Sequence, residues 1–240
     1  MEPRPHPELS GPFSVLGPEE AAEFVGLGHH ARYQTGDALL RQGERSDRVS
    51  VIVAGRVRVV RITRHGEEFL LALRGPGDVI GELAAIDPAP RTATVNAIED
   101  VRVLTITGRA FTDFLRRHPH LLLAIARTLA ARLRESDRRL VEGRAEDTRT
   151  RLARQLLDLA VRYGRVADRG LELDVPLSQA QLASLVGASR EAVSLALRDL
   201  RECGGVLTGR MRITIVDVDV VRTAAFGVAT ADGSGGVNDT

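Results

Sequence analysis

The chain has 240 residues, enough for one large or two modest domains, and its hydrophobic content of 43% supports a substantial core. Its 33 basic and 32 acidic residues give a net charge of +1, so any binding of nucleic acid must depend on a local patch. A single cysteine, Cys203, excludes an intramolecular disulfide and a cysteine-ligated cluster or zinc finger within one chain. The sequence shows no signal peptide and no long apolar run, which predicts a cytoplasmic protein without a membrane segment.

The N-terminal half predicts a short helix followed by a β domain. Residues 1–17 are rich in proline and glycine without periodicity, so we expect them to be disordered, and residues 18–27 follow as a short helix. From residue 30 to residue 107, short β segments alternate with turn signals, which is typical of a barrel or sandwich. The clearest strands cover residues 49–53, 57–62, 69–73 and 101–106.

Residues 77–97 form the most informative stretch of this domain. We expect a strand that ends at Gly81, one helical turn over residues 82–86, and a second strand over residues 91–97. The first N–H groups of a helix have no partner within the helix, so a strand that turns into a helix presents donors to an anion. The stretch therefore predicts an anion site at Gly81.

Three side chains complete this predicted site. Arg91 carries a planar fork of donors that suits phosphate oxygens, and the Thr92 hydroxyl can add another. Glu82 would repel the same anion, so we expect its carboxylate to accept a hydrogen bond from a ribose hydroxyl instead. The alternative is a capped helix start beside an ion-paired surface arginine.

The Gly-Glu-Leu triplet, the short spacer and the Pro-Arg-Thr-Ala-Thr-Val run of this stretch resemble the phosphate-binding cassette of cyclic-nucleotide-binding domains. Such domains occur in bacterial cyclic-AMP receptor proteins and in cyclic-nucleotide-dependent kinases. The resemblance implies that Gly81, the amides after it including that of Leu83, Arg91 and Thr92 hold a cyclic phosphate. It also implies that Glu82 holds the ribose 2′-hydroxyl.

Neither a metal site nor a catalytic site is predicted. His29, His30 and His65 have no ligand partners at useful spacing, so we expect satisfied surface histidines and no bound metal. No Ser-His-Asp set and no pair of carboxylates stands out, so the sequence does not support an enzyme.

A long helix is predicted after Pro119, with an apolar seam at steps of three and four residues. The seam consists of Leu122, Ile125, Leu129, Leu133, Ser136 and Leu140. The family resemblance implies that this helix packs on its own copy in a parallel homodimer. The alternative is that it packs only on its own domain.

Two polar residues of this helix bear on the choice of ligand. In the family that the chain resembles, the positions of Ser136 and Asp137 reach the purine, partly from the opposite subunit. The usual pair is rich in hydroxyls, so Asp137 is a departure, and a carboxylate accepts well from guanine N1 and N2. Thr92 fits either base. We favour cyclic AMP as the ligand and keep cyclic GMP as the alternative.

The apolar seam ends after Val141, where residues 142–147 supply glycine and charges. Glycine lowers helix stability by roughly 1 kcal/mol relative to alanine. We therefore predict a hinge near Gly143, with Asp147 and Thr148 capping a new helix over residues 149–163.

Residues 177–193 are the second informative stretch. Ser178 is the expected N-cap of a helix that ends at Gly187, and Ser189 caps a second helix after a tight turn. Small Ala183 and the turn glycine let the two helices cross closely, which is the helix-turn-helix arrangement. The stretch resembles the family pattern Leu-Thr-x-x-x-Leu-Ala-x-x-x-Gly-x-Ser-Arg-Glu-Thr-Val, with serine and alanine in place of the threonines.

The start of the second helix is predicted to read DNA. Arg190 is placed for a bidentate contact to guanine and Glu191 for accepting from a cytosine amine, whereas Ser189 would contact phosphate. Many relatives place a basic residue where this chain has Leu195, so the operator sequence stays open. The predicted DNA-binding residues are Ser178, Gln179, Ser189, Arg190, Glu191, Ser194, Arg210 and Arg212. The alternative for Arg190 and Glu191 is a solvated helix start.

The C-terminal residues predict a wing, a last helix and a tail. Residues 204–215 read as two short strands around a turn that carries Arg210 and Arg212, and residues 217–225 as a helix. Residues 227–240 are polar and rich in glycine. We expect Cys203 to be packed or inert.

Together these features identify the chain as a member of the cyclic-AMP receptor and fumarate-nitrate regulator superfamily of bacterial transcription regulators. The predicted fold class is α+β, and its domains are an N-terminal cyclic-nucleotide-binding β-roll at 18–118, a dimerisation helix and hinge at 119–146, a winged helix-turn-helix at 147–226 and a flexible tail at 227–240. The resemblance implies palindromic double-stranded DNA and RNA polymerase as partners and a ligand-driven shift of the two recognition helices.

Two alternatives remain from the sequence. The first is a DNA-binding regulator of the same fold that needs no ligand, which Asp137 and the weak seam favour. The second is a cyclic-nucleotide sensor that acts through protein contacts. An enzyme with a regulatory nucleotide domain ranks last, because no catalytic residues are found.

Overall fold

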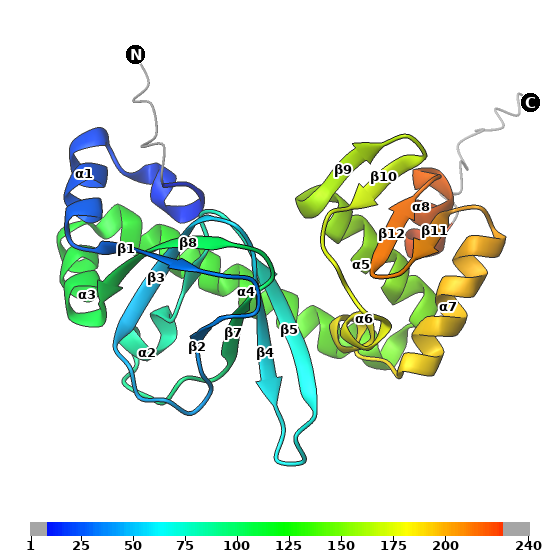
Figure 1. The fold of residues 1–240 in the computed structure, drawn as a ribbon, viewed down its shortest axis with the longest axis horizontal. Coiled ribbons are helices and arrows are strands. Elements are labelled where there is room, and N and C mark those ends of the chain that lie inside the picture. The colour runs from blue at the N-terminus through cyan, green and yellow to red at the C-terminus, as the bar shows by residue number, and fades with distance from the viewer. Residues whose placement is uncertain (1–8, 228–240) are drawn as a thin grey trace, which may run out of the picture. The chain divides into compact units, whose positions relative to one another are not determined.

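The computed structural model of the chain describes residues 9–227, apart from the side chains of residues 143 and 144. It divides into two compact units, Met1–Arg138 and Arg139–Thr240 (Figure 1). Within the described residues, no helix is long and apolar enough to cross a membrane.

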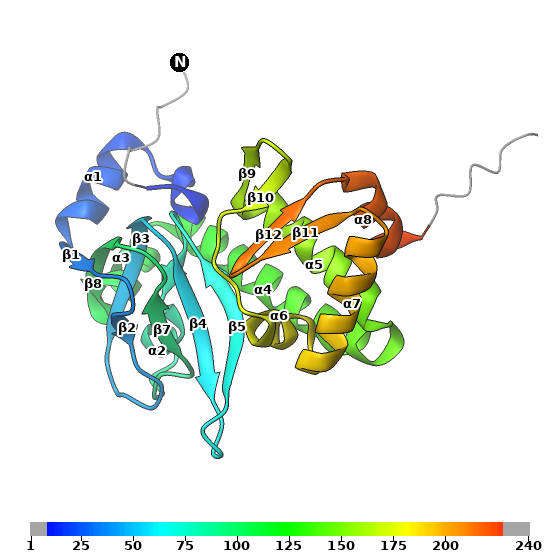
Figure 2. The ribbon, with the colours of Figure 1, turned by 45° about the vertical axis from the view of Figure 1, so that its right-hand side comes forward.

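The first unit is built on two four-stranded antiparallel sheets (Figure 2). The first sheet has the order β1 (His29–Tyr33), β8 (Val101–Thr107), β3 (Arg48–Ala54) and β6 (Val79–Ile80). The second has the order β2 (Ala38–Leu40), β7 (Thr94–Ala97), β4 (Val57–Ile62) and β5 (Glu68–Arg74). The predicted roll of short strands is therefore confirmed.

The first sheet is buried on both faces. Successive side chains of a strand point to opposite sides, so neighbouring residues of its strands enter two different cores. On strands β3 and β8, Val51 and Leu104 belong to a core shared with the helices, whereas Ile52 and Val103 belong to a core shared with the second sheet. Near-continuous apolar runs are the sequence signature of strands buried in this way.

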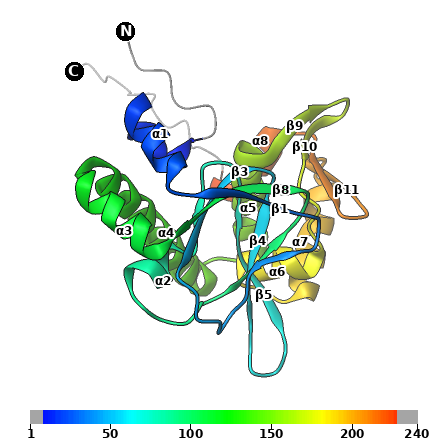
Figure 3. The same cartoon turned by 60° about the vertical axis from the view of Figure 1, so that its left-hand side comes forward.

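Helices cover the outer face of the first sheet (Figure 3). They are α1 (Pro18–Gly26), α3 (Gly108–Arg117) and the start of α4 (Pro119–Ala145), preceded by the short 3₁₀ helix η1 (Gly11–Val15). The rings of Phe13 and Phe24 lie 5.0 Å apart, and those of Phe24 and Phe114 lie 5.1 Å apart. Aromatic contacts of this kind join the N-terminal segment to the core.

The predicted disorder of residues 1–17 is wrong for residues 9–17. Leu9, Phe13 and Leu16 are 4%, 1% and 5% exposed, and all three belong to the core cluster. The apolar positions at steps of four and three bury one side of this segment, in spite of its proline and glycine content. Residues 1–8 lie outside the described part of the chain.

Helix α4 places its apolar residues on two different sides. Leu121, Ala124 and Ile125 are buried in the core of the first unit, so the prediction that Ile125 belongs to an outward seam is wrong. Leu122, Leu133 and Leu140 are 45%, 63% and 62% exposed, as an outward seam requires. The backbone of α4 stays helical through residue 143 and ends at Ala145, beyond the predicted hinge.

The second unit packs four helices against a small sheet. Its helices are α5 (Thr148–Tyr163), α6 (Gln179–Val186), α7 (Arg190–Glu202) and α8 (Val218–Phe226). Its sheet has the order β11 (Val206–Gly209), β12 (Arg212–Ile215), β10 (Gly170–Leu173) and β9 (Gly164–Ala167). The helix-turn-helix, the wing strands and the last helix are confirmed, whereas the β9–β10 hairpin was not predicted. Residues 228–240, most of the predicted tail, lie outside the described residues.

Arg154 of α5 holds the end of α4 to this unit. Its Nη1 donates to Glu142 Oε1 at 3.1 Å and to Glu146 Oε2 at 2.6 Å, and its Nε donates to the carbonyl of Ala225 at 2.9 Å. The carboxylate of Glu146 raises the pKa of Arg154 further above its ordinary value. Asp147 then caps α5, as predicted, by accepting from the Thr150 amide at 2.8 Å.

Candidate nucleotide and DNA-binding sites

Gly81 begins helix α2 (Glu82–Ile86) in the left-handed backbone conformation, with φ 81°. A Cβ atom at this position would lie 2.7 Å from the Arg48 carbonyl oxygen and 2.7 Å from Arg91 Nη1. The cassette therefore needs glycine for two reasons, the positive φ and the close approach of Arg91. The predicted one-turn helix is confirmed, but the strand expected over 91–97 begins only at Thr94.

Arg91 is 5% exposed and binds the backbone around it. Its Nη1 donates to the Gly81 carbonyl at 2.7 Å, and its Nη2 donates to the Arg48 carbonyl at 2.5 Å and to Ser46 Oγ at 3.2 Å. Its Nε is buried and has no hydrogen-bond partner among residues 9–227. Burial lowers the pKa of Arg91, while the Glu82 and Asp47 carboxylates act in the opposite direction.

Glu82 is 4% exposed and is paired with helix α4. Arg132 donates through Nη1 to Glu82 Oε1 at 2.6 Å, and through Nη2 to Asp78 Oδ1 at 3.1 Å and to the Val79 carbonyl at 3.2 Å. Burial raises the pKa of Glu82, and the Arg132 guanidinium acts against that rise. Arg132 thus joins the nucleotide cassette to the long helix, a contact that sequence reasoning missed.

The other predicted ligand residues are more exposed. Leu83 is 50% exposed and Thr92 is also exposed. Ser136 and Asp137 lie on α4, one helical turn beyond Arg132, and both are exposed. Within the described part of one chain, neither side chain bonds to the cassette, so the structure brings together Gly81, Glu82 and Arg91 but not Ser136 and Asp137.

Capping residues determine where the two helices of the helix-turn-helix begin and where the first one ends. Ser178 and Gln181 form a reciprocal capping box at the start of α6, and Gly187 ends that helix with φ 63°. Arg151 of α5 donates through Nη1 to the carbonyl of Gly187 at 3.0 Å, which covers a helix end that would otherwise lack partners. Ser189 Oγ then accepts from the Ala192 amide at 3.1 Å and starts α7.

Helix α7 buries one side and exposes the other. Val193, Ala196, Leu197 and Leu200 are all at most 3% exposed. The exposed side carries Arg190, Glu191, Ser194, Leu195 and Arg198. A helix with this division presents a row of side chains to the major groove. Arg198 was not predicted, although its spacing of four from Ser194 places it on the same side.

Two family models match the chain. A cyclic nucleotide-binding domain matches residues 30–118 and a Crp-like helix-turn-helix domain matches residues 150–223. The chain is 33% identical over 208 residues to the "CRP-like cAMP-activated global transcriptional regulator" of Mycobacterium tuberculosis, a match that covers 87% of this chain and 93% of the relative.

The chain belongs to the CRP family of transcription regulators. The "Cyclic AMP receptor protein" of Thermus thermophilus is 32% identical over 217 residues, with 90% of this chain and 97% of the relative covered. The solved structure of a "c-di-GMP Responsive Global Regulator CLP" from Xanthomonas campestris has a TM-score of 0.73 at 21% identity. It covers 83% of this chain and 99% of that one, and at this identity it supports the fold alone.

Family membership confirms the predicted fold class and the general function. This CRP-family chain is a DNA-binding transcription regulator with a cyclic-nucleotide-binding domain. The Mycobacterium tuberculosis relative is named as a transcriptional regulator.

In this CRP-family chain the wing and the first helix of the motif carry the remaining predicted DNA contacts. Arg210 is exposed at the turn between β11 and β12, where Met211 has φ 56°. Arg212 is exposed, with its Nε 3.5 Å from Glu172 Oε1 of β10. Gln179 is half-buried at the first position of α6. We expected Cys203 to be packed or inert; it is exposed after α7, so the first of these two expectations is wrong.

Proposed function

We propose that this CRP-family regulator is a homodimer that binds cyclic AMP and then binds a palindromic DNA operator. The observation that carries the proposal is the cassette itself, in which Glu82 and Arg91 are both at most 5% exposed although both are charged. Burying charged groups costs free energy even when they are paired, and here Arg91 Nε is left without an acceptor among the described residues. The two curated relatives that are named for cyclic AMP support the choice of ligand.

Arg91 and the start of α2 would hold the cyclic phosphate. The partnerless Nε of Arg91 is a buried donor, and a phosphate oxygen is an acceptor that satisfies such a group. Gly81 and the amide of Leu83 would add backbone donors, and the exposed Thr92 hydroxyl would add a further one.

Glu82 would hold the ribose. Its Oε1 already accepts from Arg132, and its other carboxylate oxygen would accept from the ribose hydroxyl. A ligand bound there shares one carboxylate with Arg132 of α4, and Ser136 and Asp137 follow one turn later. The contact gives the ligand a direct physical connection to the long helix, and binding could shift the population of its arrangements.

The exposed seam of α4 supports a dimer of two α4 helices. Leu122, Ala126, Leu129, Leu133, Ser136 and Leu140 alternate at steps of four and three, the spacing of a coiled-coil seam. Three of these leucines are between 45% and 63% exposed in one chain. Covering them with a second copy would remove apolar surface from water, and it would also bring Ser136 and Asp137 of one copy toward the other.

The exposed side of α7 would read the operator. Arg190 can donate two hydrogen bonds to a guanine edge, Glu191 can accept from cytosine, and Ser194 and Arg198 extend the row along the groove. Ser178, Ser189 and the wing arginines Arg210 and Arg212 would contact phosphates, because their donors remain exposed or partly exposed. In a symmetric dimer two such helices would read half-sites one helical turn apart.

The nature of the base is the least constrained part of the proposal. Asp137 is exposed and favours guanine by its acceptor oxygens, so cyclic GMP is the second candidate. The structure that is titled as responsive to c-di-GMP has a similar fold. Both guanine nucleotides therefore belong in any binding experiment.

The test is fluorescence anisotropy of a labelled palindromic DNA, with and without cyclic AMP, cyclic GMP or c-di-GMP. We expect cyclic AMP to strengthen DNA binding at least tenfold. Tight DNA binding that no nucleotide changes would instead establish the ligand-independent regulator. Nucleotide binding without DNA binding would establish a sensor that acts through protein contacts.

A further inference from the structure

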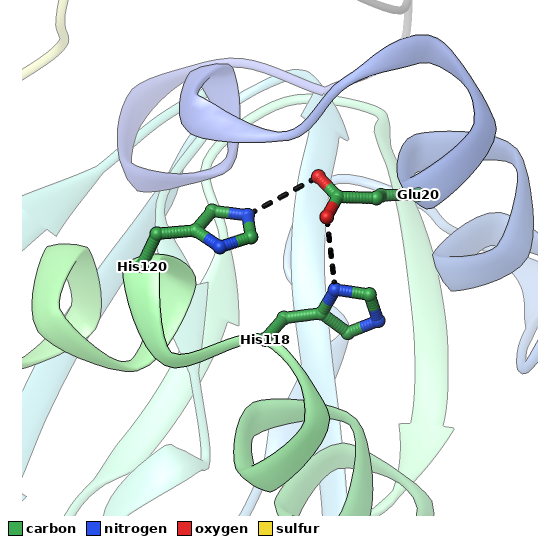
Figure 4. A group of neighbouring side chains, drawn as sticks. All are labelled: Glu20, His118 and His120. Carbon is green, nitrogen blue, oxygen red and sulfur yellow. Dashed lines mark hydrogen bonds and ion pairs between the residues drawn. The ribbon is translucent and has the colours of Figure 1, made fainter.

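Two histidines and a glutamate converge where helix α1 meets the junction between α3 and α4 (Figure 4). Glu20 comes from α1, His118 ends α3, and His120 lies in the first turn of α4. One ligand atom from each residue lies within 4.8 Å of the other two. Glu20 lies 98 residues from His118 and 100 residues from His120 in the chain, so only the fold brings the three side chains together.

The two imidazoles face the two oxygens of one carboxylate. His118 Nδ1 lies 3.1 Å from Glu20 Oε1, and His120 Nε2 lies 3.1 Å from Glu20 Oε2. Two ligands about 2.1 Å from a tetrahedral zinc ion lie about 3.4 Å apart. The two contacts to Glu20 are therefore close to the spacing that an ion needs, and one ligand atom of each histidine lies within 4.8 Å of the other.

Contacts with Phe114 and Glu23 surround the rest of the His118 ring. Its ring stacks on Phe114 with centroids 4.0 Å apart. Its other nitrogen, Nε2, is buried and lies 3.5 Å from Glu23 Oε2, which is too long for a good hydrogen bond. Glu23 is in turn paired with Arg117 at 2.6 Å. When Nδ1 binds a cation, the proton of the ring lies on Nε2, where the Glu23 carboxylate can accept it.

Without a cation, Nδ1–H of His118 and Nε2–H of His120 can each donate to one oxygen of Glu20. A metal ion would take the place of these two protons, and the proton of His118 would then lie on Nε2, beside Glu23. Two imidazole nitrogens and a carboxylate are the donor set of zinc and of other divalent transition metals, and not of magnesium or calcium.

We propose that Glu20, His118 and His120 form a binding site for a divalent transition-metal ion of the zinc type. His120 is 44% exposed on its side chain, so the site opens to solvent and a water molecule can complete the coordination. The ion would fasten α1 to the residues on both sides of Pro119, at the base of the helix that carries Arg132. The site shares no residue with the cassette or with the DNA-reading helix, and it does not depend on the function proposed above.

The experiment is a titration of the untagged, chelator-treated full chain with Zn²⁺ in competition with a zinc-binding dye. Wild type is compared with His120→Gln, with Glu20→Gln, and with His65→Gln, whose exposed histidine lies in the β4–β5 turn. We expect one ion per wild-type and per His65→Gln chain, and at least tenfold weaker binding by His120→Gln and by Glu20→Gln.

Thermal melting provides a second measurement that does not depend on the dye. Zn²⁺ should raise the melting temperature of the wild type and of His65→Gln but not that of His120→Gln, because a ligand stabilises only the state that binds it. The His120 side chain is partly exposed, so its variant should melt like the wild type without metal. Equal zinc affinity of wild type and His120→Gln, or no binding above the dye background, would overturn the proposal.

Discussion

The nucleotide cassette and the DNA-reading helix solve opposite physical problems. In the cassette, Glu82 and Arg91 are almost completely buried. Glu82 accepts a hydrogen bond from Arg132, and Arg91 donates to the backbone of the cassette. On α7, Arg190, Glu191 and Ser194 are exposed on a helix that is stabilised by other residues on its opposite side. The charged groups of the first site therefore contribute hydrogen bonds that stabilise the fold, whereas those of the second site lie on the surface of a helix that other residues stabilise.

This difference determines what a substitution can report. A change in the cassette alters ligand binding and stability together, because the same side chain serves both. A change on the exposed side of α7 alters DNA binding alone, because Val193, Leu197 and Leu200 keep the helix in place. Stability and binding must therefore be measured side by side in the first unit, and can be separated in the second.

The largest effect is expected from Arg132→Ala. The substitution leaves the Glu82 carboxylate buried without its partner. Breaking a buried pair in this way costs about 3 kcal/mol of unfolding free energy, the lower end of the range because the Arg132 side chain keeps some exposure to solvent. Urea unfolding of wild type and Arg132→Ala, followed with a probe in the first unit, measures this difference in unfolding free energy.

Arg127→Ala is the matched control, since Arg127 is an exposed arginine on the same helix. It should change the unfolding free energy by no more than about 0.5 kcal/mol. A loss as large as that of Arg132→Ala would mean that the helix, and not the Glu82 pair, is responsible.

The next effect is expected from Arg190→Ala. Loss of a bidentate contact to guanine should weaken operator binding by about 1–3 kcal/mol, or roughly 5-fold to 150-fold, with no change in melting temperature or nucleotide binding. Fluorescence anisotropy with the preferred operator and with a random duplex measures it. Arg190→Lys keeps the charge and removes the planar fork. It should lose discrimination between the two duplexes while keeping random binding, and unchanged discrimination would contradict direct reading by Arg190.

The smallest effect is a pH dependence that belongs to Glu82. Burial raises the pKa of Glu82, so the folded state holds its proton more tightly than the unfolded chain does. The stabilising contribution is complete below the unfolded pKa of about 4.3 and is lost as pH rises through the higher folded pKa. The unfolding free energy of wild type should therefore fall relative to that of Glu82→Gln as pH increases above about 4.5. If the unfolding free energy of wild type instead rises relative to that of Glu82→Gln, the Arg132 guanidinium lowers the pKa of Glu82 by more than burial raises it.

The sequence was sufficient for the features that depend on local chemistry. Gly81, Gly187 and the caps Ser178 and Ser189 occupy the conformations that their residue types predict. The burial of the first sheet on both faces follows from the near-continuous apolar runs of its strands. These elements need no knowledge of distant residues, because turns, caps and periodicity are set within a few positions.

The features that the sequence could not supply depend on contacts across the chain. Arg132 meets Glu82 over a separation of 50 residues, and Glu20 meets His118 over 98. Ile125 lies on the buried side of α4 and not in an outward seam, because the core of the first unit extends to that helix. The burial of residues 9–16 does not follow from their content of proline and glycine, because it depends on three apolar residues that pack in the same core.

The measurement that tests the account most directly is calorimetric titration of wild type and Arg91→Ala with cyclic AMP, cyclic GMP and c-di-GMP. Arg64→Ala, an exposed arginine of the first unit, serves as the control. The account predicts that wild type and Arg64→Ala bind cyclic AMP more tightly than either guanine nucleotide. It also predicts that Arg91→Ala, folded by its melting curve, binds at least 30-fold more weakly, since charge-assisted hydrogen bonds to phosphate contribute about 2 kcal/mol or more. No heat with any nucleotide, or equal binding by folded Arg91→Ala, would contradict the nucleotide site at the centre of the account.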